Sequence, residues 1–505
     1  MTLSVVVTTA RADAVHFPAG VDPGDVDLLE EVSLPAAWAK RWAVEPSKPT
    51  LWDASNGWAT RGDLARRTKT AAGRLYGAGL RKGDRIILSA AASVDLVVAH
   101  VAALRLGLIV VPVNGAYRRG ELAHIVGDAE PRAAVVDNHE WVRWLAELAP
   151  EITVVSPRLD LEDAATPSLD QLGSRDPALL GYTSGTTGVP KGAVLTHGNL
   201  LAGAESVRIA WRWEPEDRLV LALPLFHMHG LGVGLHGTLL TGASTILLNG
   251  FSPDAVLDAA TTHDATLFFG VPTMYTRLAQ SPRVGELSRL RLCVAGSAPL
   301  SADLHRRLEE AAGVRVLERY GMTETIMLVS NPYDAERRAG TVGFPLPGVE
   351  MRLAPDSGEV LVRGPNVFAG YWRRPEATEE AFDHEGWFRT GDLGELDEHG
   401  YLRLRGRAKE LVISGGLNVY PREVEDALRT HPEVDDVAIT GTPDEEWGEL
   451  VTAWVVAVAG KSPTLEGLRS HLDGVCADFK HPRLLHLVEE LPRNALGKVQ
   501  KHLLA

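Results

Sequence analysis

The amino-acid sequence predicts an α/β protein with a large N-terminal domain, built from mostly parallel sheets with helices plus a small β-barrel-like subdomain, and a small α+β C-terminal domain. Three observations support this fold class. The chain has 505 residues, well above the roughly 100–200 residues of one domain. Apolar runs alternate with helical stretches between about residues 51 and 320, which is typical of parallel sheets covered by helices. Shorter strands and a compact tail follow.

The strands of the large domain are predicted from short runs rich in Val, Ile and Leu. A strand in a parallel sheet has both faces covered, so its sequence is apolar throughout rather than alternating. The runs begin at Arg85, Val110, Ala134, Ile152, Leu219, Thr245, Thr266, Leu290 and Val314. Between them, residues 95–107 and 301–313 carry apolar side chains at helical spacing, which predicts helices that connect the strands.

In the last third of the chain the sequence pattern changes from long apolar runs to short alternating segments. Short alternating segments at 359–363 and 401–405, separated by Gly and Pro, predict the strands of the barrel-like subdomain. After Gly406, Pro421 is suited to the first turn of a helix. Strands at 436–440 and 450–458 and a helix near Leu465 complete the tail. We therefore divide the chain into an unassigned segment (1–45), a large domain (46–406) and a small domain (407–505).

Composition excludes several classes of function. Lys and Arg number 51 against 66 Asp and Glu, a formal net charge of −15, whereas a protein that binds nucleic acid through phosphates needs an excess of positive charge. The two cysteines, Cys293 and Cys476, cannot form a disulfide framework or a thiolate zinc cluster. No apolar run reaches the roughly 20 residues of a membrane span, and no basic region precedes the first apolar stretch, as a signal peptide requires. We expect a cytoplasmic protein without nucleic-acid or membrane partners.

The segment Tyr182–Gly192 has the composition of a phosphate-binding loop. Three glycines and four hydroxyl side chains surround a single lysine, so a flexible backbone and many donors can wrap a polyphosphate. Lys191 is followed by glycine, and the upstream glycine spacing also differs from the P-loop pattern. The string instead resembles the phosphate loop of the adenylate-forming superfamily, which includes acyl-CoA synthetases, luciferases and peptide-synthetase adenylation domains. The resemblance implies that ATP is bound by Thr183, Ser184, Gly185, Thr186, Thr187 and Lys191.

Further superfamily motifs follow in the expected order. In Glu318–Thr325 the resemblance implies that Tyr320, with Gly321, stacks on adenine, that Thr323 bonds the α-phosphate, and that Glu324 binds Mg²⁺ together with Thr183. Carboxylate and hydroxyl oxygens suit this hard cation. A second short motif ends in Asp392, whose carboxylate is expected to accept from both ribose hydroxyls, with Arg407 nearby.

The same resemblance implies a mobile small domain with a hinge at residues 407–410, centred on Lys409. Gly415 and Gly416 are expected to let the backbone approach the pantetheine arm of coenzyme A. The string Pro492–Lys501 resembles the loop that carries the catalytic lysine, which assigns that role to Lys498. Its ammonium would offset negative charge in the transition state. Lys501 is expected to be an ordinary solvated lysine.

The acyl site is expected around the string Pro224–Gly230. Its two histidines suggest a metal pair, but no third ligand is apparent. The resemblance assigns the acyl-site residues to His227, Met228, Ser297 and Met327.

The resemblance to malonyl-CoA synthetases is strongest at residues 270–278, 296–300, 318–327, 364–372, 415–425 and 492–501. It implies malonate, with methylmalonate as the alternative, as the substrate of a CoA ligase that forms an acyl adenylate. A distal carboxylate needs a partner in the pocket, and Arg277 is the candidate because a guanidinium binds carboxylates bidentately; Arg283 and Arg306 come next. The alternatives are a ligase for another short carboxylic acid, an enzyme that loads a carrier protein, and a nucleotide-binding protein that has lost catalysis. The protein is expected to be a monomer or a homodimer.

Overall fold

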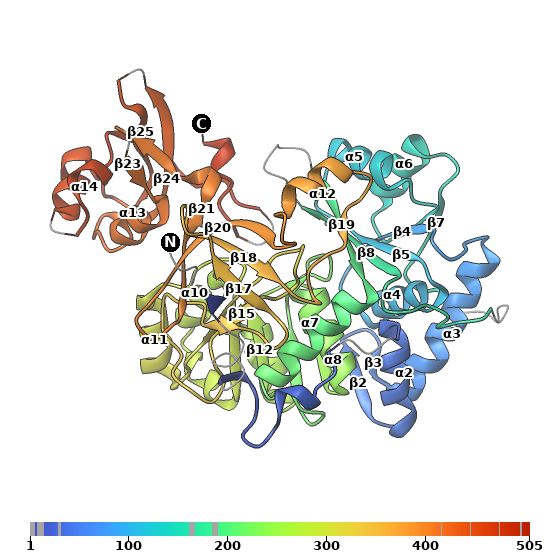
Figure 1. Ribbon diagram of the computed structural model, residues 1–505. Coiled ribbons are helices and arrows are strands. Elements are labelled where there is room, and N and C mark those ends of the chain that lie inside the picture. Colours follow the sequence, from blue (N-terminus) through green and yellow to red (C-terminus); the bar gives the residue numbers. More distant parts are fainter. Residues whose placement is uncertain are drawn as a thin grey trace.

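The structure is a computed structural model that describes residues 6–7, 15–28, 32–160, 167–183, 190–415, 417–444, 446–473, 475–494 and 497–504. It contains a large lobe with three sheets and a small lobe formed by the C-terminal residues (Figure 1). This is the mixed α/β architecture that the sequence predicts. Within the described ranges, no helix combines the length and the apolar character needed to cross a membrane.

The first sheet of the large lobe has the strand order β19-β9-β8-β5-β4-β6-β7. Strands β4 to β8 pair in parallel, and the edge at β9 and β19 is antiparallel. Its strands are β4 (Arg85–Ser89), β5 (Ile109–Pro112), β6 (Ala133–Val136), β7 (Thr153–Val155), β8 (Pro177–Thr183), β9 (Lys191–Thr196) and β19 (Gly370–Tyr371).

The second sheet has the order β16-β15-β14-β13-β12-β10-β11-β2-β3, with parallel pairing from β14 to β2 and antiparallel pairs at both edges. Its strands are β2 (Pro49–Asp53), β3 (Gly57–Thr60), β10 (Arg218–Leu221), β11 (Ser244–Leu247), β12 (Leu267–Gly270), β13 (Leu292–Ala295), β14 (Leu317–Tyr320), β15 (Val329–Ser330) and β16 (Phe344–Pro345). The apolar run that predicts β10 covers residues 219–226, but the strand ends at Leu221, five residues before the end of that run. The strand does not continue because Pro224 lacks the N–H that a central strand requires. The released residues form the loop that leads to His227.

Helices cover both sheets. They are α2 (Leu34–Val44), α3 (Arg61–Gly77), α4 (Val94–Leu106), α5 (Arg119–Ala129), α6 (His139–Leu148), α7 (His197–Ala210), α8 (His236–Thr241), α9 (Pro253–Thr262), α10 (Pro272–Ala279), α11 (Ala302–Ala312) and α12 (Pro375–Ala381), with a π-helical segment η2 (His229–Leu235) before α8. Helix α4 is apolar on every side and almost wholly buried, as expected of a helix enclosed by other elements. Ser33 caps α2, whose buried Leu34, Trp38 and Trp42 pack in the same core.

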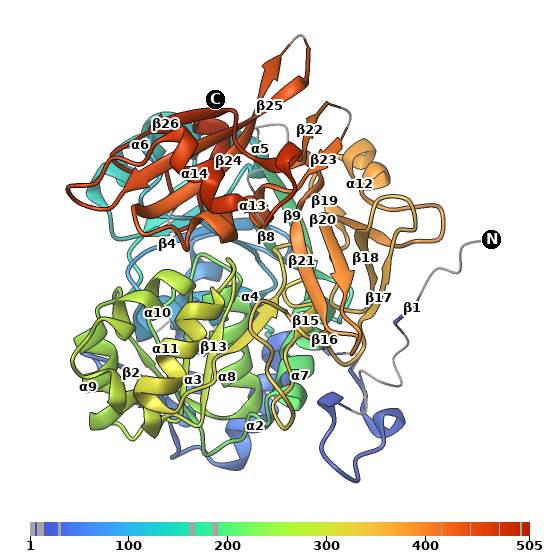
Figure 2. The same ribbon diagram turned by 90° about the vertical axis from the view of Figure 1, so that its left-hand side faces the viewer.

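The third sheet is antiparallel and takes the place of the expected barrel-like subdomain. Its order is β1-β17-β18-β20-β21, with strands β1 (Val6–Val7), β17 (Glu350–Leu353), β18 (Glu359–Arg363), β20 (Phe388–Leu396) and β21 (Leu402–Arg407). Figure 2 shows β1, from the start of the chain, beside β17. Residues from both ends of the large lobe therefore share this sheet.

The small lobe consists of a five-stranded sheet with two helices, the α+β composition that the sequence predicts. Its elements are β22 (Val412–Ser414), β23 (Leu417–Val419), α13 (Pro421–Leu428), β24 (Val434–Asp444), β25 (Gly448–Ala457), α14 (Leu465–Leu472) and β26 (Leu484–Leu487). Short 3₁₀ turns occur in both lobes, namely η1 (Pro23–Asp25), η3 (Val284–Arg289), η4 (Ala408–Glu410), η5 (Asp478–Lys480) and η6 (Lys501–Leu503). The turn η4 joins β21 of the large lobe to β22.

Candidate active site

The hairpin β8–β9 brings the expected phosphate-loop residues to one end of the first sheet. Thr183 and Lys191 are register partners at its open end. The Tyr182 hydroxyl donates to Asp128 over 2.8 Å and anchors the hairpin. The Lys191 ammonium lies 5.4 Å from the centre of the Tyr371 ring. Ser184, Gly185, Thr186 and Thr187 lie outside the described residues, so their expected contacts remain predictions.

Glu324 lies close to this hairpin and is buried. A side chain at Gly181, on β8, would overlap Thr323, so the absence of a side chain there lets the two segments meet. The Tyr371 hydroxyl donates to Glu324 over 3.0 Å. Burial raises the pKa of the Glu324 carboxyl, because the loss of hydration outweighs the stabilisation of the anion by the Tyr371 hydroxyl and the Arg407 charge. The carboxylate of Glu324 and the hydroxyl of Thr183 are oxygen donors of the kind that fits Mg²⁺.

Asp392 and Arg407 face each other across the hairpin β20–β21. They are register partners, and the Arg407 Nε lies 3.0 Å from Asp392 Oδ1. Asp392 is also what chiefly raises the pKa of Arg407. The other carboxylate oxygen accepts from the hydroxyl of Tyr320, at the end of β14. The structure thus brings together the residues expected at adenine and ribose.

The C-terminal loop brings Lys498 within electrostatic range of the same carboxylate. A side chain at Gly497 would lie 3.2 Å from Thr273 on α10, so this loop of the small lobe rests against the large lobe. Desolvation and the Arg407 guanidinium lower the pKa of the Lys498 ammonium, while Asp392 is close enough to oppose them. The two lobes therefore sit in an arrangement in which Lys498 faces the ribose side of the site.

Lys501 differs from the solvated lysine that the sequence predicts. Its ammonium lies 2.6 Å from Glu425 on α13 and 3.4 Å from Glu410 in η4, and its side chain is only 17% exposed. The charge is thus partnered on both sides. Lys501 ties the end of the Lys498 loop to the helix and to the turn between the lobes.

The acyl-side residues follow strands β10 and β13 of the second sheet, which are separated by β12. His227 and Met228 follow β10, and Ser297 follows β13 with a φ of +70°. Burial lowers the pKa of His227 to about 4, so the ring is neutral at physiological pH. Its Nδ1 accepts from the His229 N–H over 3.4 Å, while the His229 ring is buried without a hydrogen-bond partner and stacks on Phe269. His229 thus packs in the core, and among the described residues no cluster of three side chains that could hold a metal ion includes either histidine.

Arg319 is a functional candidate that the sequence analysis missed. It is 5% exposed, and among the described residues its Nε and Nη2 find no acceptor. Burial lowers the pKa of its guanidinium to about 9. A side chain at Gly296 would lie 2.5 Å from the guanidinium carbon, and the Arg319 charge also lowers the pKa of His227. Arg319 therefore places an unpaired cation beside the expected acyl residues.

The sequence feature that could have identified Arg319 is the pair of adjacent charged residues, Glu318 and Arg319, at the end of a predicted strand. Adjacent residues of a strand point to opposite faces, so Glu318 and Arg319 cannot pair with each other. Glu318 is satisfied on its own face by the Leu300 N–H at 2.9 Å and by His305 at 3.1 Å. A central strand that carries a charge on its other face needs a partner, and here the described protein supplies none.

Arg277 is exposed, whereas a residue that binds a carboxylate inside the pocket is expected to be buried. It is exposed on α10, and its guanidinium lies 5.1 Å from the centre of the Phe251 ring. Phe251 and Met274 line a cavity of about 550 Å³ between the ends of the first and second sheets. Arg277 follows Met274 by three residues and so lies near the rim of this cavity. Its role in binding a distal carboxylate remains a prediction.

The residue expected at the hinge lies in η4, and the first glycine expected at coenzyme A directly follows β22. Lys409 is exposed in η4. Gly415 has a φ of +59°, and its N–H donates to the Trp447 carbonyl over 2.8 Å. Gly416 is outside the described residues, and the coenzyme A assignment stays a prediction.

Comparison with known proteins covers both lobes. The family described as AMP-binding enzyme matches residues 38–372, and the AMP-binding enzyme C-terminal domain matches residues 423–498. A feruloyl-CoA synthase from Amycolatopsis sp is 37% identical over 458 residues, which cover 88% of this chain and 92% of that protein. The sulfoacetate–CoA ligase of Cupriavidus necator is 35% identical, covering 93% of this chain and 96% of the relative.

Two further matches carry malonate or ATP in their descriptions. The mitochondrial malonate–CoA ligase of Mus musculus is 36% identical over 473 residues, covering 83% of this chain and 80% of the relative. The crystal structure of ATP-bound MatB from Rhodopseudomonas palustris is 40% identical and superposes with a TM-score of 0.88, covering 93% of this chain and 98% of that chain.

Proposed function

We propose that this chain, which belongs to the AMP-binding enzyme family, is a ligase that joins malonate to coenzyme A. Membership of the family, with several CoA ligases among its relatives, makes the chain an AMP-forming acyl-CoA ligase that works through an acyl adenylate. The relatives act on different acids, from ferulate to sulfoacetate and malonate. The choice of malonate therefore depends on the residues of the acyl site.

Arg319 is the observation that carries this choice. A buried guanidinium without an acceptor destabilises the free protein, and an anion that binds beside it removes that cost. Ferulate and simple monocarboxylates offer no second anionic group. Malonate does, and its two carboxylates are separated by a single carbon, which suits a small pocket. Met228 and Met327 are both buried, and we expect them to limit the volume of this pocket.

The residues on the nucleotide side suit the first half-reaction. A carboxylate oxygen of malonate forms a bond to the α-phosphorus of ATP while the bond to the bridging oxygen breaks, and pyrophosphate leaves. Asp392 and Arg407 hold the ribose, and Thr323 with the loop from Thr183 to Lys191 holds the phosphates. Lys498 lies within electrostatic range of Asp392, and its ammonium would stabilise charge that develops at the α-phosphate. Mg²⁺ held by Glu324 and Thr183 would screen the charge on the phosphates when bound.

The second half-reaction requires a different surface. The thiol of coenzyme A attacks the acyl carbon of malonyl-AMP, AMP leaves, and the thiol proton is released. In this arrangement of the lobes the Gly415 backbone packs against Trp447 of the small lobe, and we expect the small lobe to turn about η4 to present it to coenzyme A. Rotation at Lys409 would withdraw Lys498 as it brings the glycine hairpin in. The position of Lys498 and Gly415 on one mobile lobe would then let the two half-reactions alternate.

A screen of pyrophosphate release across acids tests this function. We expect malonate to give the highest kcat/KM, methylmalonate to be weaker, and butyrate and ferulate to be poor substrates. Release should continue through many turnovers only when coenzyme A is present. The sulfoacetate arm is informative because its sulfonate is also an anion that Arg319 could bind.

The other outcomes identify the alternatives. A preference for butyrate or ferulate would replace malonate by another short or aromatic acid and would leave Arg319 unexplained. Turnover that needs a carrier protein in place of coenzyme A would indicate a loading enzyme. Binding of ATP without pyrophosphate release with any acid would indicate a protein that has lost catalysis.

A further inference from the structure

Ile326 has a backbone conformation that a β-branched residue rarely adopts. Its φ is +59°, in the left-handed region where the Cβ of an L-residue crowds the backbone. The Met327 N–H donates to the Thr325 carbonyl over 2.6 Å, so Thr325–Met327 form a tight three-residue turn with positive φ at its centre, the rarer and strained form of γ-turn. We call this segment the Ile326 turn. Strain of this kind persists only where the surrounding structure holds it in place.

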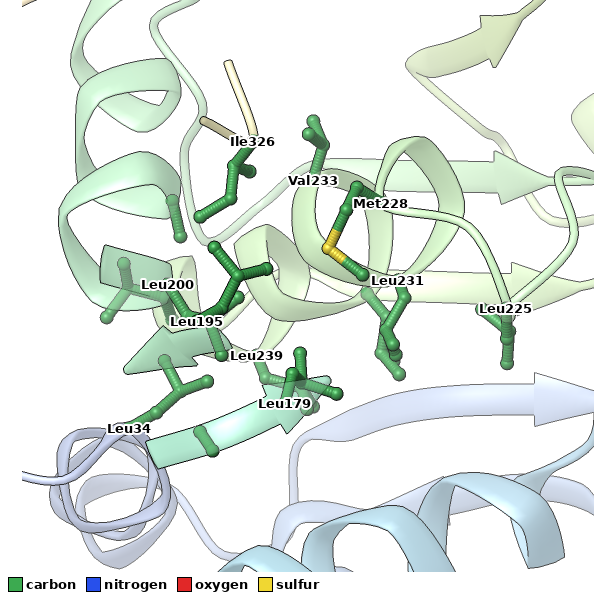
Figure 3. Close-up of a cluster of buried hydrophobic side chains, with 14 of the residues drawn as sticks. Leu34, Leu179, Leu195, Leu200, Leu225, Met228, Leu231, Val233, Leu239 and Ile326 are labelled. Carbon is green, nitrogen blue, oxygen red and sulfur yellow. The ribbon is translucent and has the colours of Figure 1, made fainter. Parts of the chain in front are cut away.

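The side chain of Ile326 is held between two glycines. A side chain at Gly203 on α7 would lie 3.1 Å from Ile326, and one at Gly232 in η2 would lie 3.4 Å from it. Figure 3 shows Ile326 in one buried cluster with Leu200 and Met228. The two glycines therefore leave space into which the Ile326 side chain packs. This packing alone does not prevent the backbone from relaxing.

The backbone of the turn is held by Asn366, in the loop between β18 and β19. Asn366 is 1% exposed, and its side-chain amide donates to the Thr325 carbonyl over 2.9 Å and to the Met327 carbonyl over 2.7 Å. Both hydrogens of one amide group thus bridge the two ends of the Ile326 turn. Two residues further on, the Phe368 N–H donates to the Glu324 carbonyl over 2.7 Å.

The loop that carries Asn366 is itself fixed by a second asparagine. The side-chain amide of Asn199, on α7, donates to the Pro365 carbonyl over 2.7 Å and to the Val367 carbonyl over 2.8 Å. These two carbonyls flank Asn366. Helix α7 therefore supports the Ile326 turn at two points. Gly203 packs against the Ile326 side chain, and Asn199 fixes the loop that carries Asn366.

We propose that Asn366 is a positioning residue that maintains the Ile326 turn and thereby fixes the carboxylate of Glu324 relative to the pocket wall at Met327. This inference rests on the proposed function, because that function gives Glu324 its metal and Met327 its place against the acyl group. Without the bridge from Asn366, Ile326 relaxes toward negative φ, and the residues on both sides of the turn move together. One side chain that touches neither ligand thus influences both metal use and acid selectivity.

Asn366→Leu tests the proposal, since leucine has nearly the shape of asparagine but donates no hydrogen bond. With the full chain, pyrophosphate release is measured against Mg²⁺ concentration at saturating ATP, and kcat/KM is measured for malonate and methylmalonate. We expect the Mg²⁺ concentration at half-maximal rate to rise about tenfold, the effect of losing roughly one net hydrogen bond. The methylmalonate-to-malonate ratio should change in the same variant.

Asn331→Leu is the matched control. Asn331 is also 1% exposed, and its amide also donates to two carbonyls, those of Glu318 at 3.2 Å and Thr341 at 2.8 Å. Both variants should lower the thermal midpoint, but only Asn366→Leu should change the Mg²⁺ response and the substrate ratio. Ile326→Gly in the Asn366→Leu background should recover part of the Mg²⁺ response, because glycine adopts positive φ without strain.

The outcomes separate this inference from the proposed function. If Asn366→Leu loses stability as Asn331→Leu does but keeps the wild-type Mg²⁺ response and substrate ratio, Asn366 is only structural and the inference is overturned. If Asn366→Leu does not fold, Asn199→Leu replaces it, and we expect smaller changes in the same direction; unchanged values there also overturn the inference. If the wild type prefers another acid, malonate is wrong, while the Mg²⁺ response with the accepted acid still tests Asn366.

Discussion

Replacement of Arg319 by methionine should remove most of the preference for malonate. Arg319 is 5% exposed and has no acceptor among the described residues, so a distal carboxylate in the pocket would form a buried ion pair with it. Removal of one partner of such a pair costs about 3–5 kcal/mol, and about 1.4 kcal/mol corresponds to a factor of ten. We therefore expect kcat/KM for malonate to fall by about two to four decades in Arg319→Met.

The same change should affect butyrate very differently. Its methyl end leaves the guanidinium unpaired in the wild type, so Arg319→Met removes a destabilising contact and kcat/KM for butyrate should stay level or rise. The quantity to measure is the malonate-to-butyrate ratio in a continuous pyrophosphate-release assay. The free protein should also become more stable to heat, because an unpaired buried cation has been removed.

Arg277→Met is the comparison that decides between the two arginines. Arg277 is exposed, and an exposed ion pair contributes about 0–1 kcal/mol, so the malonate rate should fall by less than about tenfold. A larger effect from Arg277 than from Arg319 would show that closure of the site buries the α10 arginine instead. A parallel loss for malonate and butyrate in Arg319→Met would refute the ion-pair argument and make Arg319 a structural residue.

Three other predictions follow from the two lobes and the buried histidines. Lys498→Ala should abolish pyrophosphate release but spare thioester formation from supplied malonyl-AMP, and equal loss of both steps would contradict its assignment. Lys409→Pro fixes φ near −65° and should slow thioester formation far more than pyrophosphate release; if neither step slows, the hinge lies elsewhere. His100, whose Nε2 lies 2.9 Å from that of His236, has a pKa lowered by burial to about 3. The unfolded chain takes up this proton near pH 6.5, so on acidification to pH 5 stability should fall by about 2 kcal/mol from this residue. Urea unfolding at pH 7 and pH 5 measures the difference, and His100→Gln should reduce it.

The sequence was sufficient for the architecture because both sheets are built from short runs rich in β-branched residues. A continuous apolar run is typical of a central strand with both faces of its sheet covered by helices. The runs at 85–89 and 109–112 form such strands, β4 and β5. The end of β10 was missed, since proline stops the strand while the apolar pattern continues. Boundaries therefore depended on single residues, while the order of the elements did not.

The site was predictable only where chemistry lies in contiguous motifs. Glu324, Asp392 and Lys498 sit in recognisable strings, and the structure brings them around one place. Arg319 lies within the motif Glu318–Thr325, but its role could not be predicted from the motif. Its lack of a hydrogen-bond acceptor among the described residues is a property of the folded strand and not of the sequence. Asn366 and Ile326 lie far apart in the chain, and a positive φ at isoleucine has no signature in the sequence. Arg277 was named as the candidate partner of a distal carboxylate, and the structure places it on the exposed side of α10.

Helix α2 limits how far the chain can be shortened from its N-terminus. The region matched by the family begins at residue 38, in the middle of this helix, so a chain cut there would lose the Ser33 cap and the buried side chain of Leu34. The Leu34 N–H also donates to the ring of His197 over 3.3 Å, at the first residue of α7. The cut would thus expose apolar core and release the start of the helix that carries Asn199 and Gly203. A shortened protein intended for expression should therefore begin before Ser33, and one that begins at Trp38 is expected to lose both stability and the support behind the Ile326 turn.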